Sequence, residues 1–222
     1  MLCASASRLL STKHGCLRHT VCNANSSIGG GIESVLAPFL GRHMSSYAAL
    51  PDQTDELLIT QEKSTVTVTL NKPKTLNSLT QAMVASLNVV LPALPSNNVT
   101  TLLVKSTPHP KIKAFCAGGD VRKVYDSGLG LVDEGNGSKC TEDFFFDEYR
   151  MNYKSSQLLD SHGISQVSIW DGIVMGGGVG VSIHGAYRIA TENTVLAMPE
   201  TGIGLFPDVG GMWWLPRLEV SK

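Results

Sequence analysis

The sequence predicts an α/β fold with mixed or parallel sheets, and three observations support this prediction. Segments that alternate like strands are interleaved with segments whose apolar residues recur at helical spacing. Glycines gather at two places where a strand is expected to pass into a helix. Of the 222 residues, 42% are hydrophobic and 17% are charged, which is enough apolar material for one packed domain and excludes a disordered chain.

A β-hairpin followed by a helix is expected at the start of the folded region. Residues 65–70 alternate strictly between polar and apolar side chains, as a strand with one buried face does, and residues 57–60 form the strand before it. Thr80 is the expected N-cap of a helix whose apolar residues recur at helical spacing. Pro92 and Pro95 are expected to end this helix.

Strands and helices are expected to keep alternating through the rest of the chain. Four further strands are expected at residues 101–106, 167–170, 187–191 and 194–197. Helices are expected to begin at Val121, to run over residues 141–160 and to begin again at the glycines of residues 176–178, with a glycine-rich loop over residues 127–139. No period of about 20 to 50 residues repeats, so solenoids and propellers are excluded.

The first 50 residues have the composition of an organelle transit peptide. They are rich in Ser, Ala and Leu and lack the continuous hydrophobic segment of a secretory signal. Their charged residues are Arg8, Lys13, Arg18 and Arg42 against the single acid Glu33. We therefore expect residues 1–50 to be a leader and residues 51–222 to form the folded domain. The alternative is a disordered tail.

Charge and cysteine content exclude several classes of partner. The formal net charge is −1, and because the leader carries an excess of base, the remainder is mildly acidic, unlike a nucleic-acid-binding surface. No apolar run approaches the ~20 residues of a membrane-spanning helix. Outside the leader only Cys116 and Cys140 remain, and their spacing is typical of neither a zinc site nor a disulfide scaffold. We expect no metal, no nucleic acid and no membrane partner.

Two glycine-rich segments, residues 117–120 and 175–180, lie where a strand is expected to pass into a helix. The first N–H groups of a helix lack partners within it, and the helix dipole favours negative charge there. The spacing fits neither the Gly-x-x-x-x-Gly-Lys nor the Gly-x-Gly-x-x-Gly phosphate-binding pattern. One such turn usually reflects close backbone packing. Two could each give one N–H to a single carbonyl oxygen, forming an oxyanion hole worth about 3 to 4 kcal/mol per donor.

Two carboxylates, Glu200 and Asp208, follow the second glycine-rich segment. They lie eight residues apart in an otherwise apolar, glycine-rich stretch, which is unusual for surface charges. Desolvation there would raise the pKa of Glu200 and make it a better base near neutral pH. The alternative is that Glu200 caps a helix and Asp208 begins one.

Together these segments resemble the crotonase (enoyl-CoA hydratase/isomerase) superfamily, and within it the 3-hydroxyisobutyryl-CoA hydrolase family. The resemblance covers the chain from about residue 57 to its end and is carried by residues 70–73, 76–77, 114–122, 144–149, 171–185 and 198–218. It implies the crotonase-like fold, a spiral of ββα units. It also implies hydrolysis of the 3-hydroxyisobutyryl-CoA thioester in mitochondrial valine breakdown, in agreement with a leader that directs the chain to the matrix. Coenzyme A would be part of the substrate, and no other cofactor is expected.

The resemblance implies a role for each of five residues. Gly119 and Gly177 would supply the two N–H groups of the oxyanion hole. Glu200 would be the catalytic carboxylate, either as a base for water or as the nucleophile. Asp208 would hold the substrate hydroxyl or relay a proton, and Glu148 would also contact the hydroxyacyl group. Fixed amides at the carbonyl oxygen would stabilise the tetrahedral state more than the substrate.

The resemblance also bears on the reaction type and on the extent of the chain. Hydratases of the superfamily carry a second catalytic glutamate where this chain has Gly180, which favours hydrolysis over hydration. Relatives continue beyond the position of Lys222 through a large helical part, so we expect a truncated chain whose full-length form could be a homo-oligomer. The alternatives are an enoyl-CoA hydratase or isomerase, and a non-catalytic protein associated with the mitochondrial ribosome.

Three other side chains could suggest a different nucleophile. Cys116 lies next to the first glycine-rich segment, but no arrangement of histidine and carboxylate supports it, and a small buried residue is the preferred interpretation. Ser182 and His184 are neighbours without a Gly-x-Ser-x-Gly elbow, so core or helix-face roles are expected. The hydrolase interpretation requires that the amides of Gly119 and Gly177 face one site with Glu200 beside it.

Overall fold

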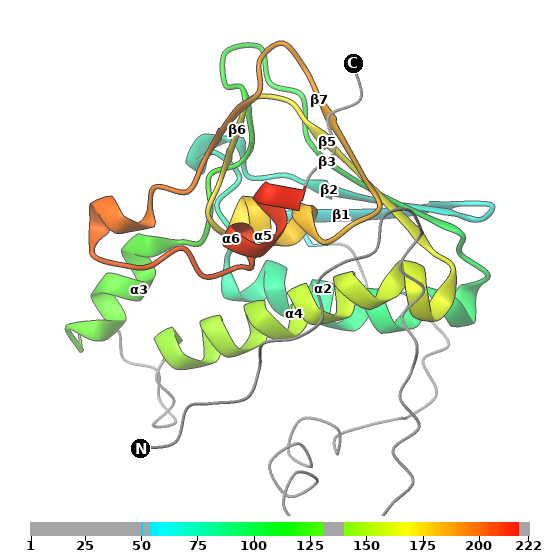
Figure 1. Ribbon diagram of the computed structural model, residues 1–222, viewed down its shortest axis with the longest axis horizontal. Coiled ribbons are helices and arrows are strands. Elements are labelled where there is room, and N and C mark those ends of the chain that lie inside the picture. The colour runs from blue at the N-terminus through cyan, green and yellow to red at the C-terminus, as the bar shows by residue number, and fades with distance from the viewer. Residues whose placement is uncertain (1–49, 51–53, 131–139, 218–222) are drawn as a thin grey trace, which may run out of the picture. The chain divides into compact units, whose positions relative to one another are not determined.

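The computed structural model describes residue 50, residues 54–130 and residues 140–217, and this part of the chain contains two β-sheets (Figure 1). The larger sheet has the strand order β1-β2-β3-β5-β7 and the smaller has the order β4-β6-β8. The strands are β1 Leu57–Glu62, β2 Thr65–Leu70, β3 Thr101–Ser106, β4 Ala114–Cys116, β5 Ser165–Trp170, β6 Ile173–Met175, β7 Tyr187–Ala190 and β8 Val195–Ala197. The α-helices are α2 Gln81–Ala93, α3 Val121–Gly128, α4 Cys140–His162, α5 Gly177–Ile183 and α6 Gly211–Trp214. The predicted α/β class is confirmed.

The first two strands form the predicted antiparallel hairpin, with Leu57 opposite Leu70. In β2 the side chains of Val66, Val68 and Leu70 are buried while the threonines between them are partly exposed, so the predicted alternation is confirmed. From β2 onward the larger sheet is parallel, with β2, β3, β5 and β7 paired in that order. Parallel neighbours require crossover connections, and the helices lie in these connections.

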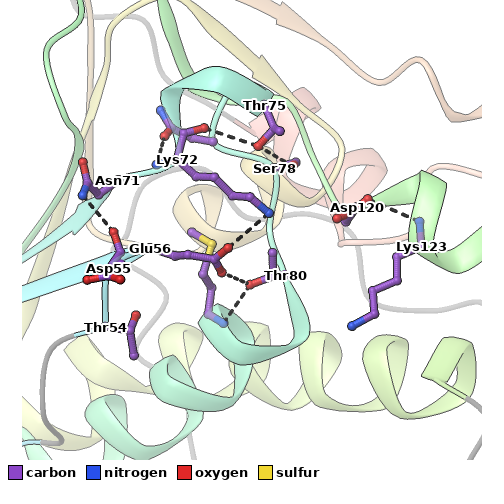
Figure 2. Close-up of polar contacts among 12 residues, drawn as sticks. Thr54, Asp55, Glu56, Asn71, Lys72, Thr75, Ser78, Thr80, Asp120 and Lys123 are labelled. Atoms are coloured by element: carbon purple, nitrogen blue, oxygen red, sulfur yellow. Dashed lines mark hydrogen bonds and ion pairs between the residues drawn. The ribbon is translucent and has the colours of Figure 1, made fainter. Parts of the chain in front are cut away.

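Helix α2 begins after Thr80, as predicted. The Thr80 hydroxyl accepts a hydrogen bond from the Met83 amide at 3.2 Å, and it donates one to Glu56 Oε2 at 2.6 Å. Lys72 Nζ lies 3.3 Å from the other oxygen of the Glu56 carboxylate (Figure 2). The hydrogen bond from Thr80 is the main cause that lowers the pKa of Glu56. This network joins the start of α2 to the residue before β1 and to the turn after β2.

Helix α2 continues past Pro92 to Ala93 and ends before Pro95, so of the two prolines predicted to end it, Pro92 does not. A proline has no N–H to donate to the carbonyl four residues earlier, which here is that of Asn88. Lys154 Nζ, from α4, donates to the Asn88 carbonyl oxygen instead, at 2.7 Å. A proline is therefore tolerated in the last turn of α2 because the neighbouring helix supplies the missing donor.

We expect Lys154→Met to destabilise the protein by about 1 to 3 kcal/mol, because it leaves the Asn88 carbonyl without a donor. Pro92→Ala provides a backbone N–H for the same oxygen, so the lysine substitution should cost less in that background. Urea unfolding of the four proteins in this double-mutant cycle measures the difference. Equal costs in both backgrounds would show that Lys154 does not replace the donor that Pro92 lacks.

From β3 onward the chain repeats a unit of two strands and a helical segment. Each unit gives one strand to the larger sheet, one to the smaller sheet and then a helical turn or helix: β3-β4-α3, β5-β6-α5 and β7-β8-η3, where η3 is the 3-10 helix Glu200–Ile203. Both sheets stack these units through parallel pairing. This arrangement is the predicted spiral of ββα units. The connections within the units differ in length, so the sequence shows no constant period.

Helix α5 lies in the space between the two sheets, and α2 and α4 pack side by side (Figure 1). All residues of α5 are buried, and the helix contacts strands of both sheets as well as α4. Helix α2 buries the apolar residues that predicted it: Met83, Val84, Leu87, Val90 and Leu91. The glycine-rich start of α5 therefore lies inside the fold, next to the ends of the strands of the smaller sheet.

The sequence does not predict β6, because three residues between two glycine-containing turns give no detectable alternation. Helix α4 extends slightly beyond the predicted residues 141–160 at both ends. The transit-peptide prediction covers residues 1–50, and all of these except Leu50 lie outside the described residues, as does most of the predicted glycine-rich loop. Within the described ranges, no helix combines the length and apolarity needed to cross a membrane.

Candidate active site

A cavity of about 680 Å³ brings together residues from five segments of the chain. All five site residues predicted from the sequence line it: Gly119, Gly177, Glu148, Glu200 and Asp208. They come from the turn between β4 and α3, the start of α5, the middle of α4, the start of η3 and the turn before α6. Three of these segments follow β4, β6 and β8, and because these strands are parallel, their carboxyl ends meet at one edge of the smaller sheet.

The first glycine turn is held by the residues just before α2. The Leu79 N–H donates to the Gly118 carbonyl at 2.8 Å, and the Asp120 N–H donates to the Leu79 carbonyl at 3.0 Å. The Gly119 N–H between them has no hydrogen-bond acceptor among the described residues. Asp120 then caps α3 by accepting from the Lys123 N–H at 3.3 Å. The turn therefore holds one uncommitted amide at the cavity wall.

The second glycine turn begins α5 and lies against the first. The Gly177 N–H, at the first position of α5, also has no acceptor within the described part of the chain. A Cβ atom on Gly177 would lie 3.2 Å from the Gly119 nitrogen, and a Cβ atom on Gly118 would lie 3.5 Å from the Gly177 nitrogen. A Cβ atom on Gly177 would also collide with Glu148 Oε1. The two free amides are neighbours, and the absence of a side chain at residue 177 keeps the space between them open.

Glu148 brings a buried carboxyl group from α4 to the same place. Its side chain is 2% exposed, and its Oε1 has no hydrogen-bond partner among the described residues. Burial raises the pKa of Glu148 to about 8, and the negative charges of Asp208 and Glu200 contribute to the rise. Near neutral pH the group is therefore mainly protonated, and its O–H can donate a hydrogen bond.

The raised pKa of Glu148 makes the stability of the fold depend on pH. Between its ordinary pKa of 4.5 and about 8 the folded protein holds a proton that the unfolded chain has lost, so this contribution to stability is complete below about pH 4.5 and is lost as the pH rises through about 8. We expect Glu148→Gln to reduce the fall in the free energy of unfolding between pH 6 and 9, by at most about 1.4 kcal/mol per pH unit. Urea unfolding across this range measures it, with the exposed Glu62→Gln as control. Parallel curves for wild type and Glu148→Gln would contradict the prediction.

Glu200 opens η3 and points its carboxylate at the start of α5. A Cβ atom on Gly176 would lie 2.8 Å from Glu200 Oε1. The side chain is 7% exposed, and neither carboxylate oxygen has a hydrogen-bond partner of good geometry in the described residues. Burial raises the pKa of Glu200, with the charge of Asp208 adding to the effect and the residue's own amide opposing it. An uncommitted carboxylate in this position can take a proton from water or attack a carbonyl carbon.

Asp208 lies in the turn before α6 with both of its oxygens engaged. The Tyr149 hydroxyl donates to Oδ2 at 2.5 Å, and the Val209 N–H donates to Oδ1 at 2.9 Å. The two helix-end alternatives for the acids are wrong. Asp208 does not begin a helix, because the N-cap of α6 is Gly210, and Glu200 makes no capping hydrogen bond in η3.

Gly180 lies on α5 facing the same turn, and it has no space for a side chain. A Cβ atom there would lie 2.8 Å from Val209 Cβ and 3.1 Å from Asn152 Nδ2. A glutamate at this position, as expected for the hydratases that the sequence resembles, would collide with both neighbours. The acids that accompany Glu200 in this cavity come instead from α4 and from the turn before α6.

The rest of the cavity wall is largely apolar. Its apolar members include Val121, Val124, Tyr125, Phe144, Phe145 and Leu205. Phe144 is 4% exposed and packs on the first glycine turn, where a Cβ atom on Gly119 would lie 3.0 Å from its ring. Phe146 is 46% exposed, as expected because three consecutive aromatic residues cannot share one face of a helix. A largely apolar cavity that also contains three acids and two free amides suits a ligand with an apolar part and a polar, reactive group.

The other candidate nucleophiles have structural roles. Cys116 is completely buried, and burial raises the pKa of its thiol to about 12, far from that of a reactive cysteine. The Ser182 hydroxyl accepts from Trp170 Nε1 at 3.0 Å and donates to the Gly178 carbonyl at 2.7 Å. Within the described ranges, no cluster of three or more His, Cys, Asp or Glu side chains could hold a metal ion.

His184 positions the turn that carries Asp208. Its Nδ1 accepts from Trp214 Nε1 at 2.7 Å, so its Nε2 carries the proton and donates to the Val209 carbonyl at 3.0 Å. Burial lowers the pKa of His184, which favours this neutral form. The histidine therefore fixes the residue next to Asp208 and is not paired with Ser182.

Tyr149 is a site residue that the sequence does not single out. Its partner Asp208 is 59 residues away along the chain, and no spacing rule connects a tyrosine on one helix with an acid in a later turn. The available signal is its position directly after Glu148 in a segment that carries the family resemblance.

Comparisons with known proteins find a family model and curated relatives that are similar to this chain. A family model described as enoyl-CoA hydratase/isomerase matches residues 65–221. The chain is 43% identical over 169 residues to a mitochondrial 3-hydroxyisobutyryl-CoA hydrolase of Gallus gallus, covering 76% of this chain and 40% of the relative. It is 41% identical over 183 residues to the mitochondrial 3-hydroxyisobutyryl-CoA hydrolase of Dictyostelium discoideum, covering 81% of this chain and 45% of the relative. The chain therefore spans less than half the length of these curated relatives.

Solved structures show the same fold. A carnitinyl-CoA dehydratase from Mycobacterium thermoresistibile matches with a TM-score of 0.63 and 40% identity, over 74% of this chain and 45% of that one. The crotonase-like fold predicted from the sequence is confirmed by this likeness together with the family match.

Proposed function

Because the chain belongs to the enoyl-CoA hydratase/isomerase family, we propose that it hydrolyses the thioester of 3-hydroxyisobutyryl-CoA to 3-hydroxyisobutyrate and free CoA. The observation that carries this proposal is the meeting of two neighbouring free amides, those of Gly119 and Gly177, with the buried and unpaired carboxylate of Glu200 in one cavity. The names of the curated relatives supply the substrate.

The two amides form the oxyanion hole of the proposed reaction. The thioester carbonyl oxygen accepts hydrogen bonds from the Gly119 and Gly177 N–H groups, and its charge grows as the carbonyl carbon becomes tetrahedral. Because the amides have no other acceptor within the described part of the chain, they need not break a bond to serve the transition state.

Glu200 is the proposed catalytic carboxylate. As a base it takes a proton from water while the water oxygen bonds to the carbonyl carbon, and the carbon–sulfur bond then breaks as the proton passes to the leaving thiolate. As a nucleophile it bonds to the carbonyl carbon, expels the thiolate, and is released when water cleaves the resulting anhydride. In a single turnover in ¹⁸O-labelled water, unlabelled acid identifies the nucleophilic route, because its new oxygen can then come only from the carboxylate of Glu200.

Asp208 and Glu148 are proposed to recognise the hydroxyl group of the acyl chain. The Asp208 side chain accepts a hydrogen bond from the hydroxyl group, and the protonated Glu148 donates one to the hydroxyl oxygen, so the alcohol has both an acceptor and a donor. The raised pKa of Glu148 supports this division of roles.

Release of free thiol from a panel of acyl-CoA thioesters tests the proposal with the purified chain. We expect release from 3-hydroxyisobutyryl-CoA to exceed that from isobutyryl-CoA. No release above the uncatalysed rate from any member of the panel would overturn the proposal for this chain. The second candidate, an enoyl-CoA hydratase, is favoured by the carnitinyl-CoA dehydratase likeness, and loss of the crotonyl-CoA double bond on addition of the chain would identify it.

The cellular location proposed for this chain is based on the names of its curated relatives. We propose a mitochondrial location, in the matrix, because the similar hydrolases are named mitochondrial, and fractionation of cells tests this. No cofactor beyond the CoA of the substrate is proposed. A homo-oligomer stays a prediction that sedimentation measures. Co-sedimentation with mitochondrial ribosomes and no thioesterase activity would favour the non-catalytic alternative.

A further inference from the structure

Tyr149 contacts the proposed site without any role in the chemistry described so far. Its hydroxyl donates to Asp208 Oδ2 at 2.5 Å, at the short end of the range for a hydroxyl bonded to a carboxylate. Tyr149 comes from the same helix as Glu148. Helix α4 therefore supplies both Glu148 itself and the hydrogen-bond partner of Asp208, the other acid proposed to recognise the hydroxyl group.

The orientation of Tyr149 is itself supported. Its ring stacks on Phe145, with the ring centroids 6.1 Å apart and 30° between the planes, and Phe145 lines the cavity. Burial is the main cause that raises the pKa of the Tyr149 phenol, and its hydrogen bond to Asp208 adds to this. The hydroxyl therefore remains a proton donor toward Asp208 through the physiological pH range.

Two donors fix the plane of the Asp208 carboxylate. Tyr149 occupies one acceptor position on Oδ2, and the Val209 amide, at 2.9 Å, occupies one on Oδ1. A carboxylate has about four acceptor positions, so those that remain can only accept. Since Asp208 lines the cavity, a bound acyl group meets an oriented hydrogen-bond acceptor there. A hydroxyl satisfies this acceptor, a methyl group does not, and a carbonyl oxygen is repelled by it.

We propose that Tyr149 is a positioning residue that orients Asp208 and thereby sets a preference for 3-hydroxyacyl thioesters over acyl thioesters that lack a 3-hydroxyl group or carry a 3-oxo group. The inference rests on the proposed thioester hydrolysis and adds to it the residue that enforces selection of the acyl group. It assigns no bond-making step to Tyr149.

The test compares Tyr149→Phe with a matched control, Tyr153→Phe. Tyr153 lies one turn further along α4, is 66% exposed, and makes no hydrogen bond through its hydroxyl in the described structure. The measurement is kcat/KM for 3-hydroxyisobutyryl-CoA, isobutyryl-CoA and acetoacetyl-CoA. We expect Tyr149→Phe to lower the ratio of hydroxyacyl to deoxyacyl hydrolysis about tenfold, chiefly through kcat/KM for the hydroxy substrate, and Tyr153→Phe to leave that ratio unchanged.

A second substitution connects the effect to Asp208. In an Asp208→Ala background, Tyr149→Phe should not change the ratio further, because the carboxylate that it orients is absent. An equal loss on all three substrates, or the same additional loss in the Asp208→Ala background, would overturn the positioning role. Wild-type protein that hydrolyses none of the substrates contradicts the proposed function itself, whereas a selective wild type with an unchanged ratio in Tyr149→Phe contradicts only the role of Tyr149.

Discussion

Glu200→Gln is expected to lower thioester hydrolysis by roughly 10² to 10⁴-fold while the protein remains folded. The substitution preserves the size of the side chain and removes only its ability to take a proton or to attack a carbonyl carbon. Both oxygens of the carboxylate lie unpaired at the cavity, so the change breaks no hydrogen bond that holds the fold together. Thiol release under saturating 3-hydroxyisobutyryl-CoA measures the loss.

We expect Glu200→Gln to lower activity without lowering the free energy of unfolding. Burial raises the pKa of Glu200, which means that the folded protein disfavours its charged form. A neutral amide removes this cost and relieves repulsion from Asp208, so the free energy of unfolding should not fall. Glu192→Gln, on the exposed turn between β7 and β8, is the control, and it should change neither quantity. Unchanged turnover in Glu200→Gln would refute its catalytic role, and marked destabilisation would show that the carboxylate is structural.

The strands and helices that the sequence predicts are those with a strong periodic signal. β2 alternates over six residues and α2 shows helical spacing behind Thr80, and both occur where predicted. The position of Pro92 inside α2 could not be predicted. It is tolerated because Lys154, which lies 66 residues after Asn88 in the chain, donates a hydrogen bond to the Asn88 carbonyl. Local sequence rules account for the backbone N–H that a proline lacks, but they cannot identify a hydrogen-bond donor on a helix that is distant in the sequence.

The residues of the candidate site also divide into those that the sequence indicates and those that only the folded structure shows. Glycines at strand-to-helix turns and acids in an apolar stretch are visible in the sequence, so residue type and position select two glycine-rich segments and Glu200 as candidates. The family resemblance then singles out Gly119 and Gly177 within those segments. The raised pKa of Glu148 and the hydrogen bond between Tyr149 and Asp208 are not visible there, because both arise from the packing of α4 against segments that follow it. Chemistry that depends on residue type is predictable from the sequence, and chemistry that depends on proximity is not.

Gly177→Ala is expected to lower the rate of hydrolysis by about 10² to 10³-fold, as the loss of an oxyanion-hole donor does, because its methyl group would hold the carbonyl oxygen away from the two amides. The added methyl group would lie 3.2 Å from the Gly119 nitrogen, in the space beside the two amides that the carbonyl oxygen needs. Its most severe collision is with the end of the Glu148 side chain, which can rotate away, so the loss of stability should stay within about 2 kcal/mol. Stopped-flow thiol release and urea unfolding measure the two effects.

The control for Gly177→Ala is Gly202→Ala, in η3 two residues after Glu200. A Cβ atom on Gly202 would meet no atom within 4 Å, so this alanine should alter neither kcat nor stability. A non-hydrolysable thioether analogue of the substrate should bind Gly177→Ala nearly as well as wild type, because it has no carbonyl oxygen that needs the space beside the two amides. If Gly177→Ala retains full turnover, the two amides do not form the oxyanion hole. If it fails to fold, then Glu148 cannot move aside, and the packing of the fold requires the open space at residue 177.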